Sequence, residues 1–120
     1  MDQPTPAEYS LPLIKPYVLV VEDVDTTRRR IAETLRANGY HVDEAVDGRD
    51  ALRKVSATRF DAILLDLVMP NVDGYEFRAT QLRHPEMANI PTVVVTAATV
   101  RERDRYALGI KQVLNKPFED

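Results

Sequence analysis

Five side chains that could take part in chemistry each follow an apolar stretch of this sequence: Glu22, Asp23, Asp66, Thr96 and Lys116. Three are carboxylates, one is a hydroxyl and one is an ammonium group. If the apolar stretches are strands of one parallel sheet, their carboxyl ends lie along one edge, where such sheets bind ligands. The spacing therefore predicts one polar site built from segments far apart in the sequence.

The charges of this set limit what it can do. Three neighbouring carboxylates repel one another unless a cation lies among them, and oxygen ligands of this kind suit Mg²⁺. A carboxylate can also attack phosphorus and form an acyl phosphate, provided that cations and donors meet the charge of the phosphoryl oxygens. Mg²⁺, Lys116 and Thr96 could meet that need. The set is thus suited to Mg²⁺-assisted phosphoryl transfer.

Short apolar runs predict five strands, over residues 17–21, 40–45, 62–65, 90–95 and, more weakly, 112–114. The first, third and fourth runs are uninterrupted aliphatic stretches. Such stretches are typical of strands that are buried on both faces of a parallel sheet.

Four helical stretches alternate with these runs: one opened by Asp25 and ended by Asn38-Gly39, one over 48–57, one opened by Asp73-Gly74, and one over 101–108. Asp25 is expected to cap the first helix. The resulting order, βαβαβαβαβ, predicts an α/β fold with a doubly wound, five-stranded parallel sheet.

The composition predicts one domain. A chain of 120 residues with 44% hydrophobic content can bury one core, and a net charge of -3 lacks the basic balance of a nucleic-acid-binding protein. The absence of cysteine excludes disulfides and thiol chemistry. We expect the proline-rich residues 1–16 to form an irregular arm and residues 17–120 to form the domain. The N-terminus shows no signal peptide or membrane span, so a cytoplasmic location is expected.

Four short motifs resemble those of the receiver domains of two-component response regulators. They are VLVVED at 18–23, LLDLVMPNVDG at 64–74, VVVTA at 93–97 and KPF at 116–118, in the family's order and near its spacing. The resemblance implies a flavodoxin-like, CheY-like fold and a function in a phosphorelay. A sensor histidine kinase or a histidine phosphotransfer protein would donate the phosphoryl group, and the domain would catalyse only its own modification.

Carried over residue by residue, the resemblance implies a role for each acidic member of the site. Asp66 would be the phosphoacceptor and Asp23 a direct ligand of Mg²⁺. Glu22 would bind the ion through water, and Val68 would contribute its backbone carbonyl.

The resemblance also implies roles for the remaining two side chains. Thr96 would be the hydroxyl that turns toward the phosphoryl group. Lys116 would be the cation that contacts it, with a cis peptide bond to Pro117. Phosphorylation would then shift a balance between two conformations of the region around the fourth expected helix.

Two features depart from the family pattern. Val113 stands where the family usually has Tyr or Phe, so no aromatic ring can rotate together with the threonine. The sequence stops at Asp120, where receivers continue into a fifth helix, so we expect a missing C-terminal helix and an apolar patch on one sheet face. Unless the sequence is a piece of a longer protein, a second copy in a homodimer, or the arm with Tyr9 and Leu11, should cover that patch.

Alternative interpretations remain at this point. A phosphatase of the haloacid-dehalogenase type would also use Mg²⁺ and an acyl phosphate, but Val68 stands where its D-x-D pattern needs an acid. A receiver fold that binds partners without being phosphorylated is the main alternative function. The arginine run 28–30 is expected to be either a solvated helix face or part of a kinase-docking surface.

Overall fold

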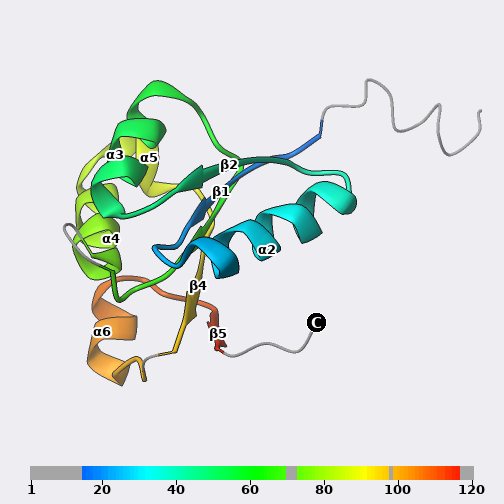
Figure 1. The fold of residues 1–120 in the computed structure, drawn as a ribbon. Helices are drawn as coiled ribbons and strands as arrows, with labels where there is room; N and C mark the ends of the chain where they lie inside the picture. Colours follow the sequence, from blue (N-terminus) through cyan, green and yellow to red (C-terminus); the bar gives the residue numbers. More distant parts are fainter. Residues whose placement is uncertain (1–14, 70–72, 98, 117–120) are drawn as a thin grey trace, which may run out of the picture.

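The computed structural model describes residues 15–69, 73–97 and 99–116. In chain order the elements are β1 (Tyr17–Val21), α2 (Asp25–Ala37), β2 (His41–Ala45), α3 (Gly48–Ala57), β3 (Ala62–Leu65), α4 (Gly74–Arg83), α5 (Pro85–Ala88), β4 (Thr92–Thr96), α6 (Glu102–Ala107) and β5 (Val113–Asn115) (Figure 1). All strand pairs are parallel, and the strand order is β2-β1-β3-β4-β5. The predicted fold class is confirmed.

The strand predictions differ from the structure only at the ends. β1 and β3 have the predicted bounds, whereas β2 begins one residue later, and β4 and β5 lie slightly further along the chain than predicted. Helix α5 was not predicted, because four residues are too few to show a helical period. It begins at Pro85, whose fixed φ angle suits the first turn of a helix.

Helices α3, α4 and α5 cover one face of the sheet (Figure 1). Alternate strand residues point to the same face of a sheet. The strand residues on this face pack with side chains from the three helices to form the main core: Leu19, Val21, Ile63, Leu65 and Val94 from the strands, with Ala51, Val55, Phe77 and Met87 from the helices.

In the described part of the chain, α2 is the helix that lies on the opposite face (Figure 1). Val18 and Val20 on this face are buried. Leu64 and Val93 are only half-buried, and Leu114 on β5 is 41% exposed. The described residues therefore leave part of this face apolar and open, while the arm residues 1–14 and residues 117–120 lie outside the described residues.

The start of α2 corrects one prediction. Asp25 is the first helical residue and does not cap the helix; Val24 occupies the N-cap position, without a side-chain hydrogen bond. The Asp25 carboxylate instead pairs with Arg28 at 2.7 Å, which withdraws it from the backbone N–H groups. The predicted end is correct, because Gly39 adopts a φ of 90° just after the helix.

Helix α4 begins as predicted. The side chain of Asp73 accepts a hydrogen bond from the backbone N–H of Glu76 at 2.9 Å. Among the described helices, none is long and apolar enough to cross a membrane.

Candidate functional site

The site lies at the carboxyl ends of β1 and β3, the two central strands between which the winding of the sheet reverses. The backbone hydrogen bonds between β1 and β3, and those between β1 and β2, continue one residue beyond the strands. The N–H of Asp66 donates to the carbonyl of Val21 at 3.0 Å, and that of Glu22 donates to Ala45 at 3.0 Å. These bonds place Glu22 and Asp66 on adjacent strand ends.

A close contact between Gly74 and the segment after β3 fixes the backbone at Asp66. A Cβ atom at position 74 would lie 2.1 Å from the Asp66 carbonyl oxygen and 2.4 Å from the Cα of Leu67. The N–H of Gly74 also donates to the Leu67 carbonyl at 2.9 Å. Only glycine allows α4 to begin this close to the strand end.

Three carboxylates form a compact cluster at this edge. One oxygen each from Glu22, Asp23 and Asp66 lies within 4.8 Å of the others. Glu22 and Asp66 are 2% and 6% exposed, respectively. The Val68 N–H donates to Asp66 Oδ1 at 3.4 Å, which places the Val68 backbone beside the cluster. This set of hard oxygen donors fits a Mg²⁺ ion.

Lys116 supplies the positive charge of the site. Its Nζ donates hydrogen bonds to Glu22 Oε1 and to Asp66 Oδ2, the latter at 3.3 Å. Its backbone N–H donates to the carbonyl of Thr96 at 2.9 Å, which extends the β4–β5 pairing beyond the strands. The ammonium group thus joins two carboxylates from different strands.

Burial dominates the electrostatics of the cluster. It raises the pKa of Glu22 to about 7, and the nearby Asp23 and Asp66 add to this rise while Lys116 opposes it. Burial lowers the pKa of Lys116, but the hydrogen bond and charge of Glu22 and the charge of Asp66 outweigh it, so the net shift is upward. The lysine is therefore charged at neutral pH, and burial favours the protonated form of Glu22 more than it would be favoured in water.

The predicted site residues thus come together at one edge, although the roles assigned to them stay predictions. Thr96 is fully buried at the end of β4. Val113 lies in β5, half-buried against the core. Pro117, and with it the predicted cis bond, lies outside the described residues.

One buried residue beside the site was misjudged from the sequence. Arg28 is only 6% exposed, so the expectation of a solvated arginine run is wrong at this position, although Arg29 and Arg30 are exposed. The signal was its spacing, because Arg28 precedes Ala32 by four residues and Leu35 by seven and therefore shares their face of the helix.

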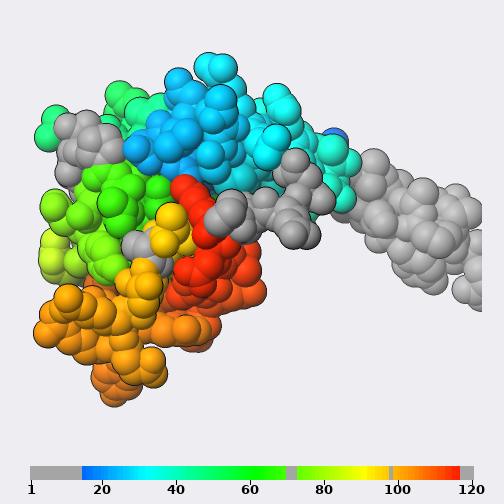
Figure 2. Space-filling model, turned by 60° about the horizontal axis from the view of Figure 1, so that its bottom comes forward, coloured from blue at the N-terminus to red at the C-terminus, as the bar shows by residue number. Residues whose placement is uncertain are grey.

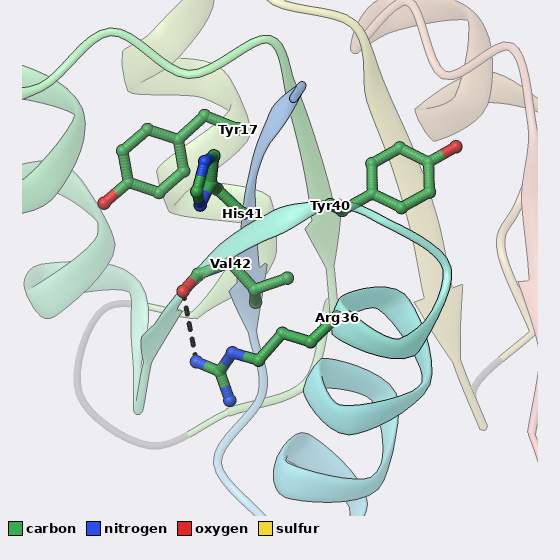
Figure 3. A pocket seen from close by; sticks show the side chains of 5 residues that line it. All are labelled: Tyr17, Arg36, Tyr40, His41 and Val42. Atoms are coloured by element: carbon green, nitrogen blue, oxygen red, sulfur yellow. Dashed lines mark hydrogen bonds between the residues drawn. The ribbon is translucent and has the colours of Figure 1, made fainter. Parts of the chain in front are cut away.

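A separate hollow of about 440 Å³ lies at the amino ends of β1 and β2 (Figure 3). It is lined by Tyr17, Arg36, Tyr40, His41 and Val42. Arg36 donates to the Val42 carbonyl at 3.1 Å. The hollow lies at the start of β1 and the carboxylate cluster follows the end of β1, so the two lie at opposite ends of the sheet.

Comparison with solved structures defines the class of this fold. The chemotaxis protein CheY4 of Vibrio cholerae superposes with a TM-score of 0.81 and 34% sequence identity, covering 88% of this chain and 89% of that one. The response regulator TrrA of Thermotoga maritima, solved in complex with Mg²⁺-BeF, gives a TM-score of 0.76 at 26% identity, covering 86% and 88%. The protein therefore has the CheY-like variant of the flavodoxin fold.

The chain belongs to the response regulator receiver domains, whose family model matches residues 18–120. It is 38% identical over 102 residues to the sensor histidine kinase RcsC of Escherichia coli, which covers 83% of this chain and 10% of that protein. It is 40% identical over 103 residues to the response regulator MprA of Mycolicibacterium vanbaalenii, which covers 84% and 44%. The chain thus spans a tenth to less than half of the length of these relatives. It is a receiver domain of two-component signalling.

Proposed function

We propose that this receiver acts as a phosphorylation switch, in which Asp66 accepts a phosphoryl group from a phosphohistidine of a sensor kinase or phosphotransfer protein. Residues 17–120 would form the receiver and residues 1–16 an arm outside it, and the switch would operate in the cytoplasm. The main support is the contact of Lys116 with Asp66 and Glu22, which brings a half-buried cation to two carboxylates at the end of the sheet.

Transfer would proceed by attack of a carboxylate oxygen of Asp66 on the phosphorus atom. The new O–P bond forms as the P–N bond of the phosphohistidine breaks, and the electron pair of that bond remains on the imidazole nitrogen, which takes up a proton. Lys116 would meet charge on the phosphoryl oxygens, and Thr96 would donate a hydrogen bond to one of them.

The carboxylate cluster would hold Mg²⁺ in this reaction. Asp23, Asp66 and the carbonyl of Val68 would bind the ion directly, and Glu22 would bind it through water. The ion would supply the positive charge that lets the carboxylates and an incoming phosphoryl group share one site. Support comes from the oxygen donors within 4.8 Å of one another and from the raised pKa of Glu22, which reflects crowded, buried negative charge.

A homodimer through the open sheet face would give the switch an output by assembly. The half-buried Leu64 and Val93 and the more exposed Leu114 support this proposal. A second copy that packed on these residues would remove their apolar surface from water.

The first experiment is intact-protein mass spectrometry after incubation with Mg²⁺ and acetyl phosphate. Wild type should gain one phosphoryl group, Asp66→Asn should gain none, and the control Asp43→Asn on β2 should behave as wild type. Absence of an adduct in wild type that binds Mg²⁺ would favour the alternative, a receiver fold that binds partners without phosphorylation.

Size-exclusion chromatography of the same samples tests the dimer, which Leu114→Lys should disrupt.

A further inference from the structure

Arg28 lies buried at the start of α2, next to the loop that carries two of the three carboxylates. It is 6% exposed, whereas its neighbours Arg29 and Arg30 are exposed. A buried guanidinium is costly unless its donors are paired. The partners of its guanidinium group therefore indicate the role of Arg28.

The guanidinium of Arg28 binds three groups from three different segments. Nη1 donates to the backbone carbonyl of Glu22 at 3.1 Å, Nε donates to Glu44 Oε1 at 3.2 Å, and Nη2 pairs with Asp25 Oδ1 at 2.7 Å. The planar guanidinium presents these donors in a fixed geometry. Arg28 thus joins the end of β1 and the first turn of α2 to strand β2.

The partner on β2 is itself held in place. Glu44 Oε2 accepts a hydrogen bond from Arg36 Nη2 at 3.3 Å, and the same guanidinium donates to the Val42 carbonyl, as Figure 3 shows. Each oxygen of the Glu44 carboxylate therefore binds a different arginine of α2. This arrangement keeps Arg28 from turning away from the Glu22 carbonyl.

The Glu22 carbonyl belongs to the peptide group that links Glu22 to Asp23. The N–H of Glu22 is fixed from β2, through its bond to the Ala45 carbonyl at 3.0 Å. With the carbonyl fixed by Arg28 as well, the backbone at Glu22 is held on both sides. The direction in which the Asp23 side chain leaves the chain depends on the orientation of this peptide group.

We propose that Arg28 is a positioning residue for the metal site, which holds the Glu22–Asp23 peptide group so that both carboxylates face Asp66. The inference rests on the proposed function, because it assumes that these carboxylates bind Mg²⁺. Arg28 acts through the backbone of the ligand-bearing loop and does not itself touch the ion.

The test compares Arg28→Met and Arg28→Lys with the control Arg29→Met, which removes an exposed arginine from the same turn. Isothermal titration calorimetry of each purified protein with MgCl₂ measures affinity, and two-dimensional NMR of the metal-free proteins follows the amides of Asp23 and Val24. We expect both Arg28 variants to bind Mg²⁺ about ten-fold more weakly, as is usual when a residue that orients a metal ligand is removed. Arg29→Met should stay within about two-fold of wild type.

The lysine variant separates positioning from charge. Lysine keeps the positive charge but cannot bridge three partners with a planar fork, so it should not restore affinity. Arg28→Lys also replaces Arg28→Met in the test if the methionine variant does not fold. NMR of the β4 amides would show whether each variant is folded. Wild-type affinity and unmoved Asp23 and Val24 amides in a folded Arg28 variant would overturn the inference.

Failure of the proposed function would give a different result in the titration from failure of this inference. If wild type itself does not bind Mg²⁺, the metal site is wrong, and with it the role of Arg28 toward the ion. The metal-free amide shifts would still report whether Arg28 holds the loop.

Discussion

The two halves of the site are built differently. The acceptor half carries Glu22, Asp23 and Asp66 on the ends of β1 and β3. Glu22 and Asp66 are buried, and the backbone is fixed through hydrogen bonds, Arg28 and the Gly74 contact. In the other half, which comprises α6 and β5, helix α6 has no buried residue and β5 is three residues long. Figure 2 shows α6, in orange, standing out from the body of the molecule beside the exposed red strand β5.

Besides the pairing of β5 with β4 and the burial of Ile110, the second half is held by one buried side chain from α4. Arg78, 7% exposed, donates from Nε to the Leu108 carbonyl at 2.9 Å and from Nη2 to the Gly109 carbonyl at 3.2 Å. Its Nη1 donates to Gln81 Oε1 at 2.9 Å. A cation at these carbonyls also suits the C-terminal end of α6.

The two halves differ in how firmly the rest of the molecule fixes them. Groups that must bind an ion together need fixed geometry, whereas an element that changes position needs a low free energy of local opening. The contacts of the acceptor half suit the first need, and the exposure of α6 suits the second. Variants in each half can test this contrast.

The largest expected effect compares two glycines. Gly74→Ala should lower the free energy of unfolding by at least about 3 kcal/mol, because the new methyl group would overlap backbone atoms of the acceptor half. Gly109→Ala should cost only about 1 to 2 kcal/mol, because its φ is +57° but the nearest atom, Arg78 Nη2, would be 3.6 Å away. Urea denaturation measures both values. Equal losses would contradict the contrast in packing between the halves.

The next effect is the pH dependence of the acceptor half. The pKa of Glu22 rises from 4.5 to about 7 on folding, so its protonated form stabilises the folded state fully below pH 4.5, and this contribution is lost as the pH rises through 7. In the metal-free protein the loss should amount to about 3 kcal/mol. Glu22→Gln should remove this slope from a series of urea titrations, and the exposed control Glu86→Gln should retain it. A wild-type stability that does not fall over this range relative to Glu22→Gln would show that burial does not govern this group.

The smallest effect concerns the anchoring of α6. Arg78→Met removes charged hydrogen bonds at the end of this helix, which should cost about 2 kcal/mol locally. Amides of residues 104–110 should then exchange with deuterium roughly 30-fold faster, while α2 amides remain unchanged. Arg83→Met, at the exposed end of α4, should leave α6 as it is. Equal acceleration in α2 and α6 would show that the two halves open together.

The sequence predicted the sheet and the members of the site because both depend on local patterns. Aliphatic runs such as Val18–Val21 indicate buried strands, and a charged residue directly after such a run must lie at the sheet edge. With the parallel order inferred from the alternation of elements, the meeting of Glu22, Asp66 and Lys116 follows from topology alone.

The buried polar contacts could not be predicted in the same way. Arg78 and Gln81 lie on the inner face of α4, where the sequence suggests only a helix of mixed composition, and their partners lie far away or on the backbone. Arg78 binds carbonyls 30 and 31 residues later in the chain, and Gln81 binds the Met87 and Ile90 carbonyls and the Thr92 hydroxyl. Carbonyl groups are the same in every residue, so no sequence pattern marks them as acceptors.

The bond between Lys116 and Glu22 also has a consequence for the order of folding. It joins residues that are 94 positions apart, and we expect Lys116 to reach Glu22 only after β5 has paired with β4 and β4 with β3, since these pairings place it there. Contacts of such high sequence separation form late, because they require closure of the whole chain. A chain that has folded only as far as β4 would hold its carboxylates together without their cation. The complete site, with Lys116 beside its carboxylates, would therefore form only once β5 has joined the sheet.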